Sequence, residues 1–239
     1  MGTLTAIRTR LKSVLCTRVI KLRDYLTQED GAGANQMNFF DYFQVASLSI
    51  ALLIFVGRAS YLRFFRNINP IAIGGGKKGV LLAVELTAII GFVAWMIEGL
   101  LSALHSSFRI FPSPLDSHLL ISFPAKIAGV ALISSGLVIF GSAYASFGDS
   151  WRVGFDVTTP GALVTTGTFA LSRNPIYVFL DLWFTGIFLI NGTLIFLIFA
   201  LLAVAVLHWQ ILQEEKFLDR LYGQPYRSYC AKIGRYFYW

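Results

Sequence analysis

The sequence predicts an all-α integral membrane protein, a helical bundle of about five transmembrane helices. Its composition is the first reason, since 56% of its 239 residues are hydrophobic and only 14% are charged. A soluble domain is less apolar and carries more charge. The second reason is a series of apolar stretches that are long enough, or nearly so, to cross roughly 30 Å of hydrocarbon. They cover residues 42–61, 80–104, 121–147, 176–190 and 193–212.

The basic residues flank the apolar stretches. The net charge is +7, but its clustering beside the predicted spans is typical of anchors at the membrane surface. We therefore expect the lipid bilayer as a partner and no nucleic acid. Five alternating crossings place the loops 58–78 and 148–175 and the C-terminal tail on one side. This side carries most of the Lys and Arg residues, which predicts a cytoplasmic location, although the basic N-terminal segment argues for the opposite orientation.

Three regions follow along the chain. Residues 1–38 form an amphipathic segment and linker, in which apolar side chains recur every three or four positions over 4–26. This pattern indicates a helix on the membrane surface or a helix packed on the protein's own polar part. Residues 39–147 hold the first three predicted spans, and residues 148–239 hold the last two and the tail. The fourth span is the shortest and meets the fifth through Asn191-Gly192, which predicts a tight antiparallel hairpin.

Three carboxylates fall inside apolar runs, where an ionised group is costly and usually faces a partner or a watery cavity. Glu85, Glu98 and Asp181 are therefore candidates for a functional site. For Glu98 and Asp181 a paired structural role near a helix end explains the pattern equally well. The three His residues are too scattered for a metal site, and we expect no metal.

The last third of the chain contains the most informative motifs. A polar loop with several glycines leads into the fourth span through Arg173-Asn174-Pro175, and the fifth span continues into Glu214-Glu215 on the same side. Backbone groups beside a helix start can bind a carboxylate, and an acidic pair can hold an ammonium or lie beside a sulfonium. This arrangement suits a zwitterionic cosubstrate. The alternative is that the acidic pair begins a solvated amphipathic tail helix.

Residues 147–237 resemble the isoprenylcysteine carboxyl methyltransferase family, within the wider group that includes phospholipid N-methyltransferases. The resemblance rests on several motifs in the same order: 163–169 (LVTTGTF), 173–177 (RNPIY), the short helical hairpin, Glu214-Glu215, and Tyr222-Gly223-x-x-Tyr226-x-x-Tyr229 followed by Arg235. It implies a methyltransferase that uses S-adenosyl-L-methionine, with a cofactor-binding region at the C-terminal end of the membrane bundle.

The resemblance also implies roles for individual residues. It predicts cofactor contacts at Gly161, Ala162, Leu163, Val164, Phe169, Asn174, Pro175, Ile176, Tyr177, Glu214 and Glu215. It predicts catalytic roles for Arg173, Arg235 and Tyr177. Substrate contacts are expected at Gln210, Arg152 and Tyr226, and we expect Tyr226, Tyr229 and Arg235 to close the pocket as a lid.

One departure concerns the methyl acceptor. The prenylcysteine enzymes are expected to hold the substrate carboxylate with an Arg one helical turn before the acidic cofactor residue, and Gln210 stands at that position. A prenylated cysteine carboxylate, a phospholipid amine and another hydrophobic molecule remain open, in that order of preference. Two other classes remain as well: a nicotinamide-dependent sterol reductase, whose C-terminal pattern is related, and a non-catalytic membrane scaffold.

Overall fold

The computed structural model describes residue 20 and residues 37–67, 79–148 and 162–237, and within these ranges the protein is a bundle of helices without a β-strand. Four helices are long and apolar enough to cross a membrane, and a fifth apolar helix is shorter. The predicted all-α membrane bundle is therefore confirmed. The long helices are α2 (Phe39–Phe65), α3 (Val80–Ala103), α4 (Phe123–Phe147) and α6 (Leu194–Tyr222), and the shorter one is α5 (Pro175–Asn191).

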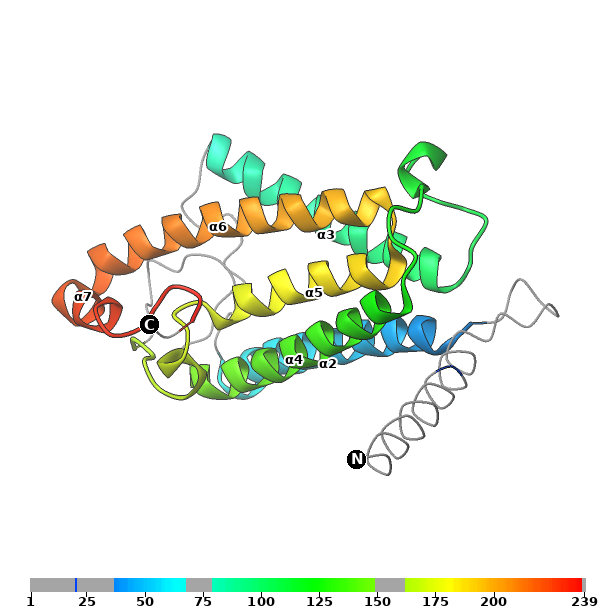
Figure 1. The fold of residues 1–239 in the computed structure, drawn as a ribbon. Helices are drawn as coiled ribbons and strands as arrows, with labels where there is room; N and C mark the ends of the chain where they lie inside the picture. The colour runs from blue at the N-terminus through cyan, green and yellow to red at the C-terminus, as the bar shows by residue number, and fades with distance from the viewer. Residues whose placement is uncertain (1–19, 21–36, 68–78, 149–161, 238–239) are drawn as a thin grey trace, which may run out of the picture.

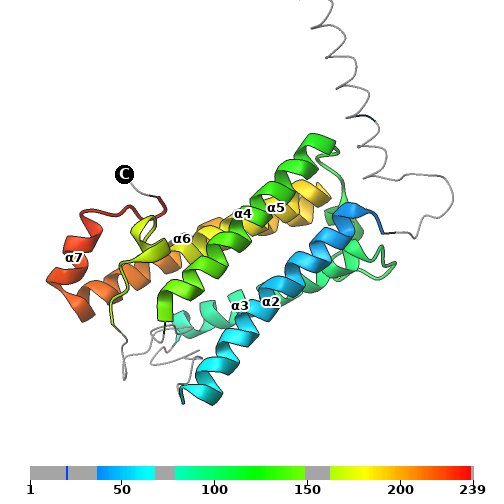
Figure 2. The ribbon, with the colours of Figure 1, turned by 90° about the horizontal axis from the view of Figure 1, so that it is seen from below.

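The bundle has two ends of different character (Figure 1). At the end that we name the hairpin end, α5 and α6 meet and α2 and α4 begin. At the opposite end, which we name the cavity end, α6 continues into the short helix α7 (Gln224–Cys230) and the C-terminal segment, as Figures 1 and 2 show. The C-terminal segment lies beside the start of α5. The predicted surface helix over 4–26 and the linker that follows it lie outside the described residues, apart from residue 20.

α2 begins with a capping box that its sequence encodes. The Asn38 side chain accepts hydrogen bonds from the backbone N–H groups of Phe40 and Asp41, and the Asp41 carboxylate accepts one from the Asn38 N–H at 2.8 Å. These bonds satisfy donors that a helix start leaves without partners. The cap fixes the first residue of α2 and buries Phe40 completely.

α4 packs along α5 through glycines that let the two backbones approach closely. A Cβ atom on Gly129 would lie 2.6 Å from the Gly186 carbonyl oxygen, and one on Gly186 would lie 2.5 Å from the Ile133 side chain. Small residues at such crossings are typical of membrane helix pairs, where close van der Waals packing drives association. This contact makes α4 and α5 the rigid centre of the bundle.

The turn between α5 and α6 is as tight as the sequence predicts. Gly192 ends α5 with a φ of 68°, a left-handed conformation that favours glycine. A Cβ atom there would lie 1.8 Å from the Leu120 carbonyl oxygen, so no other residue fits. The Gly192 carbonyl accepts hydrogen bonds from the N–H groups of Leu119 and Leu120, which ties the loop before α4 to the hairpin.

Candidate functional site

A cavity of about 860 Å³ opens between the helices and extends to the cavity end. Its size falls within the range of pockets that hold small molecules and cofactors. Helices α2, α3, α4, α5 and α6 contribute to its wall, together with the segment before α5 and helix α7. Among the residues that the sequence predicts as site residues, it is lined by Ala162, Leu163, Val164, Phe169, Arg173, Asn174, Pro175, Ile176, Tyr177, Gln210, Glu214 and Tyr226.

Two further predicted residues, Glu215 and Arg235, lie next to the cavity but do not line it. The remaining two, Gly161 and Arg152, lie outside the described residues. The structure thus gathers residues from three separated segments around one space.

The part of the cavity inside the bundle is apolar and aromatic. Helix α6 lines this part from Phe199 to Leu207, which spans about 12 Å at 1.5 Å per residue. The rings of Trp183 and Phe184 on α5 and of Phe92 on α3 form its inner wall. A long apolar chain fits this arm of the cavity better than a polar molecule does.

At the cavity end, three polar side chains form a connected group. The Tyr177 side chain on α5 is hydrogen-bonded to both Glu214 and Gln210 on α6. A carboxylate can only accept, so the Tyr177 hydroxyl donates to Glu214, and it accepts from the Gln210 amide. Gln210 and Glu214 are four residues apart and therefore lie one above the other on the same face of α6. Tyr177 thus bridges the two helices at the polar end of the cavity.

Glu215 faces away from the cavity and joins two arginines. Its carboxylate accepts two hydrogen bonds from the Arg235 guanidinium, at 2.7 and 3.0 Å, and lies 3.2 Å from Nη1 of Arg173. Consecutive helical residues point about 100° apart, so Glu214 and Glu215 serve different surroundings. Glu215 holds the arginines beside the cavity, and Glu214 remains on the cavity wall.

The C-terminal segment packs against the start of α5. The Gly234 carbonyl accepts from the Arg173 N–H at 3.1 Å, and the Arg235 carbonyl accepts from the Asn174 side-chain amide at 3.0 Å and from the Ser172 hydroxyl at 3.4 Å. These bonds connect residues that are about sixty positions apart in sequence. They fix the orientation of the Arg-Asn-Pro block that lines the cavity.

Helix α7 covers the loop that precedes α5. The Tyr229 hydroxyl donates to the Phe169 carbonyl at 2.6 Å, and burial raises the pKa of Tyr229 to about 12. Burial also raises the pKa of Tyr226, which lines the cavity. Both tyrosines therefore stay neutral at physiological pH. They form one side of the cavity, whereas Arg235, the third residue of the predicted lid, does not line it and binds Glu215.

The loop before α5 is attached to the end of α4. The Ser146 hydroxyl accepts from the Thr168 N–H at 3.2 Å, and the Phe147 and Phe169 rings meet edge to face at 4.5 Å between centroids. Gly167 has a φ of 63°, which brings its backbone close to Ser146. The Phe169 ring is thereby held on the cavity wall.

The carboxylates predicted inside apolar runs have different surroundings. Glu98 lies at the hairpin end, only 1% exposed, and accepts from the Ile110 N–H at 3.0 Å and from the Arg109 guanidinium at 3.4 Å. It therefore holds the loop after α3 in place. This is the paired structural role that the sequence left open for Glu98. Asp181 lies near His208 on the face of the α5–α6 hairpin that does not line the cavity. Glu85 is half-buried on α3 and does not line the cavity either.

Some lining residues were not predicted from the sequence. Tyr144 on α4 and Phe217, Leu218 and Tyr222 on α6 contribute to the wall. The residues on α6 could have been found, because they continue the face of Gln210 and Glu214 at helical spacing. Tyr144 comes from a helix that is distant in sequence, and no local pattern marks it.

The fold and the cavity together define a multi-pass membrane protein with a cavity that joins a polar group to an apolar arm. Residues 124–225 of this protein match the model of the phospholipid methyltransferase family. This family belongs to the wider group that also contains the isoprenylcysteine carboxyl methyltransferases, so the resemblance inferred from the sequence is confirmed. The comparison with curated proteins gave no match.

Proposed function

We propose that the protein is a membrane methyltransferase that transfers a methyl group from S-adenosyl-L-methionine to a lipid-like acceptor, with its catalytic face in the cytoplasm. One observation carries the proposal: a single cavity joins the polar group around Glu214 to an apolar arm that extends about 12 Å along α6. The polar end suits a water-soluble cosubstrate, and the apolar arm suits a chain that arrives from the bilayer. The family match over residues 124–225 supports the same reaction.

The described residues fit the cofactor. Its methyl group is supplied from a sulfonium, and its amino acid part carries an ammonium and a carboxylate. Glu214 is the one carboxylate on the described cavity wall, so it would bind the positive part of the cofactor. The backbone around Leu163 and the Phe169 ring would contact the remainder, and Tyr177 would hold Glu214 in position through its hydrogen bond.

Methyl transfer from a sulfonium is an in-line displacement. Positioning of the two reactants and exclusion of water can supply most of the acceleration. In this cavity, Arg173 and Tyr177 lie where the polar end meets the apolar arm. We assign them the role of orienting the acceptor group toward the cofactor, and we assign Arg235 the role of holding Glu215 and Arg173 in place.

The charge of the polar end favours an amine over a carboxylate as the acceptor group. Arg173 is the one cation on the described cavity wall, and it is paired with Glu215 at 3.2 Å. Gln210 offers a neutral amide, which is hydrogen-bonded to Tyr177. The reacting amino group of a lipid amine brings no negative charge of its own next to Glu214, although it must lose a proton before it attacks. A prenylcysteine carboxylate is the second candidate, and it would require Arg173 to bind both the substrate and Glu215.

Calorimetric titration tests the cofactor assignment. We expect S-adenosylhomocysteine, the demethylated product, to bind the detergent-purified wild-type protein. Glu214→Ala should weaken this binding about 100-fold or more, because it removes a charge-assisted contact in a partly desolvated site. Asp219→Asn is the matched control, since Asp219 is an acidic residue on the same helix that does not line the cavity. Equal affinity of wild type and Glu214→Ala would contradict the assignment.

A comparison of acceptors tests the charge argument. Radiolabelled methyl transfer is measured into vesicles that contain phosphatidylethanolamine and, separately, into a farnesylated cysteine analogue. We expect transfer to the amine lipid in the wild type, and a loss of this transfer with a gain for the carboxylate in Gln210→Arg. Transfer to the farnesylated cysteine alone in the wild type would overturn the preference for an amine and leave the methyltransferase proposal intact.

A further inference from the structure

A second polar group lies on the face of the α5–α6 hairpin that does not line the cavity. Nδ1 of His208 on α6 is 2.6 Å from the hydroxyl of Tyr236 in the C-terminal segment, and the two rings lie nearly parallel with centroids 6.0 Å apart. The Asp181 carboxylate on α5 interacts electrostatically with both of them. Three segments of the chain therefore meet at this point.

These residues are not part of the proposed cavity chemistry. Neither Asp181, His208 nor Tyr236 lines the cavity. Titratable residues within membrane helices are costly and usually have a function. Oδ1 of Asp181 is buried and has no hydrogen-bond partner within the described ranges, and Asp181 interacts electrostatically with the nearby His208. A function for this group must therefore act through another part of the molecule.

The C-terminal segment provides that connection. Tyr236 directly follows Arg235, whose guanidinium binds Glu215 and whose carbonyl accepts from Asn174. The preceding residue, Gly234, accepts from the N–H of Arg173. Arg173 and Asn174 line the cavity. The contact between His208 and Tyr236 thus holds the segment that fixes Asn174, a proposed cofactor contact, and Arg173 beside it.

We propose that His208 and Tyr236 form a clasp that positions the C-terminal segment and thereby sets the affinity for the cofactor from outside the cavity. This inference rests on the proposed function. In this clasp Nδ1 of His208 accepts from the Tyr236 hydroxyl, which requires the neutral imidazole with its proton on Nε2. His208 and Tyr236 are positioning residues.

Conservative substitutions test the clasp. Tyr236→Phe removes only the hydroxyl group, and His208→Leu removes the accepting nitrogen. Both should weaken the binding of S-adenosylhomocysteine about 5- to 10-fold, the effect of one lost hydrogen bond. In His208→Asn the side-chain oxygen can take the place of Nδ1, and the affinity should stay within about 2-fold of wild type. The KM for S-adenosylmethionine should rise in the same two variants, in step with the loss of affinity, and should stay near the wild-type value in His208→Asn.

Alkylation of Cys230 gives a readout that needs no cofactor. The Cys230 thiol is half-buried and lies 2.7 Å from Nη1 of Arg173. In a Cys16→Ser background, Tyr236→Phe should speed the reaction of Cys230 with a maleimide several-fold, because the segment that holds Arg173 beside Cys230 opens more often. Tyr61→Phe is the control, since it removes a hydroxyl from an exposed tyrosine on α2.

The two hypotheses fail in different ways. A wild-type protein that binds no S-adenosylhomocysteine would overturn the proposed function, and the Cys230 reaction would still decide whether the clasp holds the segment. If the wild type binds while Tyr236→Phe changes neither affinity nor alkylation, the clasp is overturned. A loss of affinity in His208→Asn equal to that in His208→Leu would overturn the assignment of Nδ1 as the acceptor.

Discussion

The two ends of the bundle each contain a carboxylate that the sequence places near a membrane helix, but they use it differently. At the hairpin end, Glu98 is 1% exposed and binds a guanidinium and a backbone N–H. At the cavity end, Glu214 binds the Tyr177 hydroxyl and lines a cavity of about 860 Å³. An acidic residue in an apolar run therefore does not by itself mark a site. Whether such a carboxylate can bind a ligand depends on whether a cavity lies next to it.

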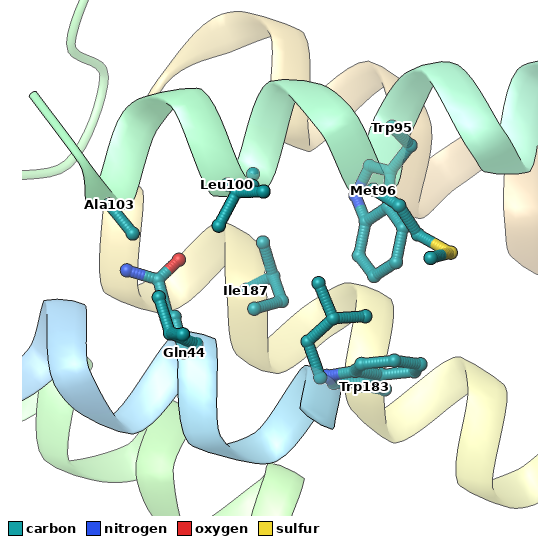
Figure 3. A pocket seen from close by; sticks show the side chains of 10 residues that line it. Gln44, Trp95, Met96, Leu100, Ala103, Trp183 and Ile187 are labelled. Atoms are coloured by element: carbon teal, nitrogen blue, oxygen red, sulfur yellow. The ribbon is translucent and has the colours of Figure 1, made fainter. Parts of the chain in front are cut away.

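At the hairpin end, the polar side chains bind one another and connect the helices. Asp41 lies 2.9 Å from His105, and the Asn191 side chain donates to Gln44 at 2.6 Å and accepts from Ser102 at 2.8 Å. The nearby cavity between α2, α3 and α5 has a volume of only about 20 Å³ (Figure 3). This volume is enough for about one water molecule. A satisfied polar network with so little space leaves no room for a substrate.

The largest effect that separates the two ends is expected from Glu98→Ala. This change removes the nearer of the two carboxylates beside the half-buried Arg109, leaving only Asp116 at 3.6 Å, and removes the acceptor of the Ile110 N–H. We expect a destabilisation of about 3 kcal/mol, the typical result of removing one member of a buried ion pair. Thermal unfolding in detergent measures it. Affinity for S-adenosylhomocysteine, measured below the unfolding temperature, should remain unchanged.

Glu214→Ala is the counterpart at the other end. It should lose cofactor binding while its unfolding temperature stays close to that of the wild type. The proposed difference between the two ends would be wrong if Glu98→Ala lost affinity for S-adenosylhomocysteine while keeping the unfolding temperature of the wild type. Glu98 would then belong to a functional site.

The sequence predicts the helices better than their ends. The fifth apolar stretch ends at residue 212, whereas α6 continues to Tyr222, because residues 213–222 are charged but still favour a helix. Hydropathy locates the part of a helix that lies in the membrane, and not the helix itself. The turn at Asn191-Gly192 was predicted correctly because only glycine fits its backbone conformation.

The candidate site was predictable in one half only. The order of motifs from Leu163 to Arg235 points to the polar end, and the different directions of Glu214 and Glu215, about 100° apart, follow from helical geometry. The apolar arm could not be predicted. It depends on how α2 and α3 pack against α6, and many apolar side chains of similar size would satisfy the same sequence pattern.

A smaller effect is expected from Gly129→Ala, which tests whether the tight packing of α4 on α5 supports the hairpin end. The new methyl group would lie 2.6 Å from the Gly186 carbonyl oxygen and 2.8 Å from the Ile190 side chain. We expect a destabilisation of about 2 kcal/mol from overpacking. Gly141→Ala on the same helix is the control, since a Cβ atom there meets nothing within 4 Å. An equal unfolding temperature in the two variants would contradict the close approach of α4 and α5.

The smallest effect concerns pH and is confined to the cavity end. The pKa of Tyr229 is raised from 10.0 to about 12, mainly because burial disfavours the ionised form. In the unfolded chain the same phenol loses its proton near pH 10. The stability that the neutral, hydrogen-bonded Tyr229 contributes is therefore fully present below pH 10 and is lost as the pH rises from 10 toward 12.

We expect the contribution of Tyr229 to the unfolding temperature to be constant between pH 7 and 9 and to fall between pH 10 and 11.5. Other tyrosines and the lysines titrate in the same range, so the informative quantity is the difference between wild type and Tyr229→Phe. The variant lacks the hydrogen bond to the Phe169 carbonyl and should be less stable at pH 8 by about 1 kcal/mol. The gap should narrow above pH 10, because only the wild type has a phenol to ionise at this position. A gap that stays constant or widens with pH would show that Tyr229 ionises as easily in the folded protein as in the unfolded chain, and that α7 does not shield it at the cavity end.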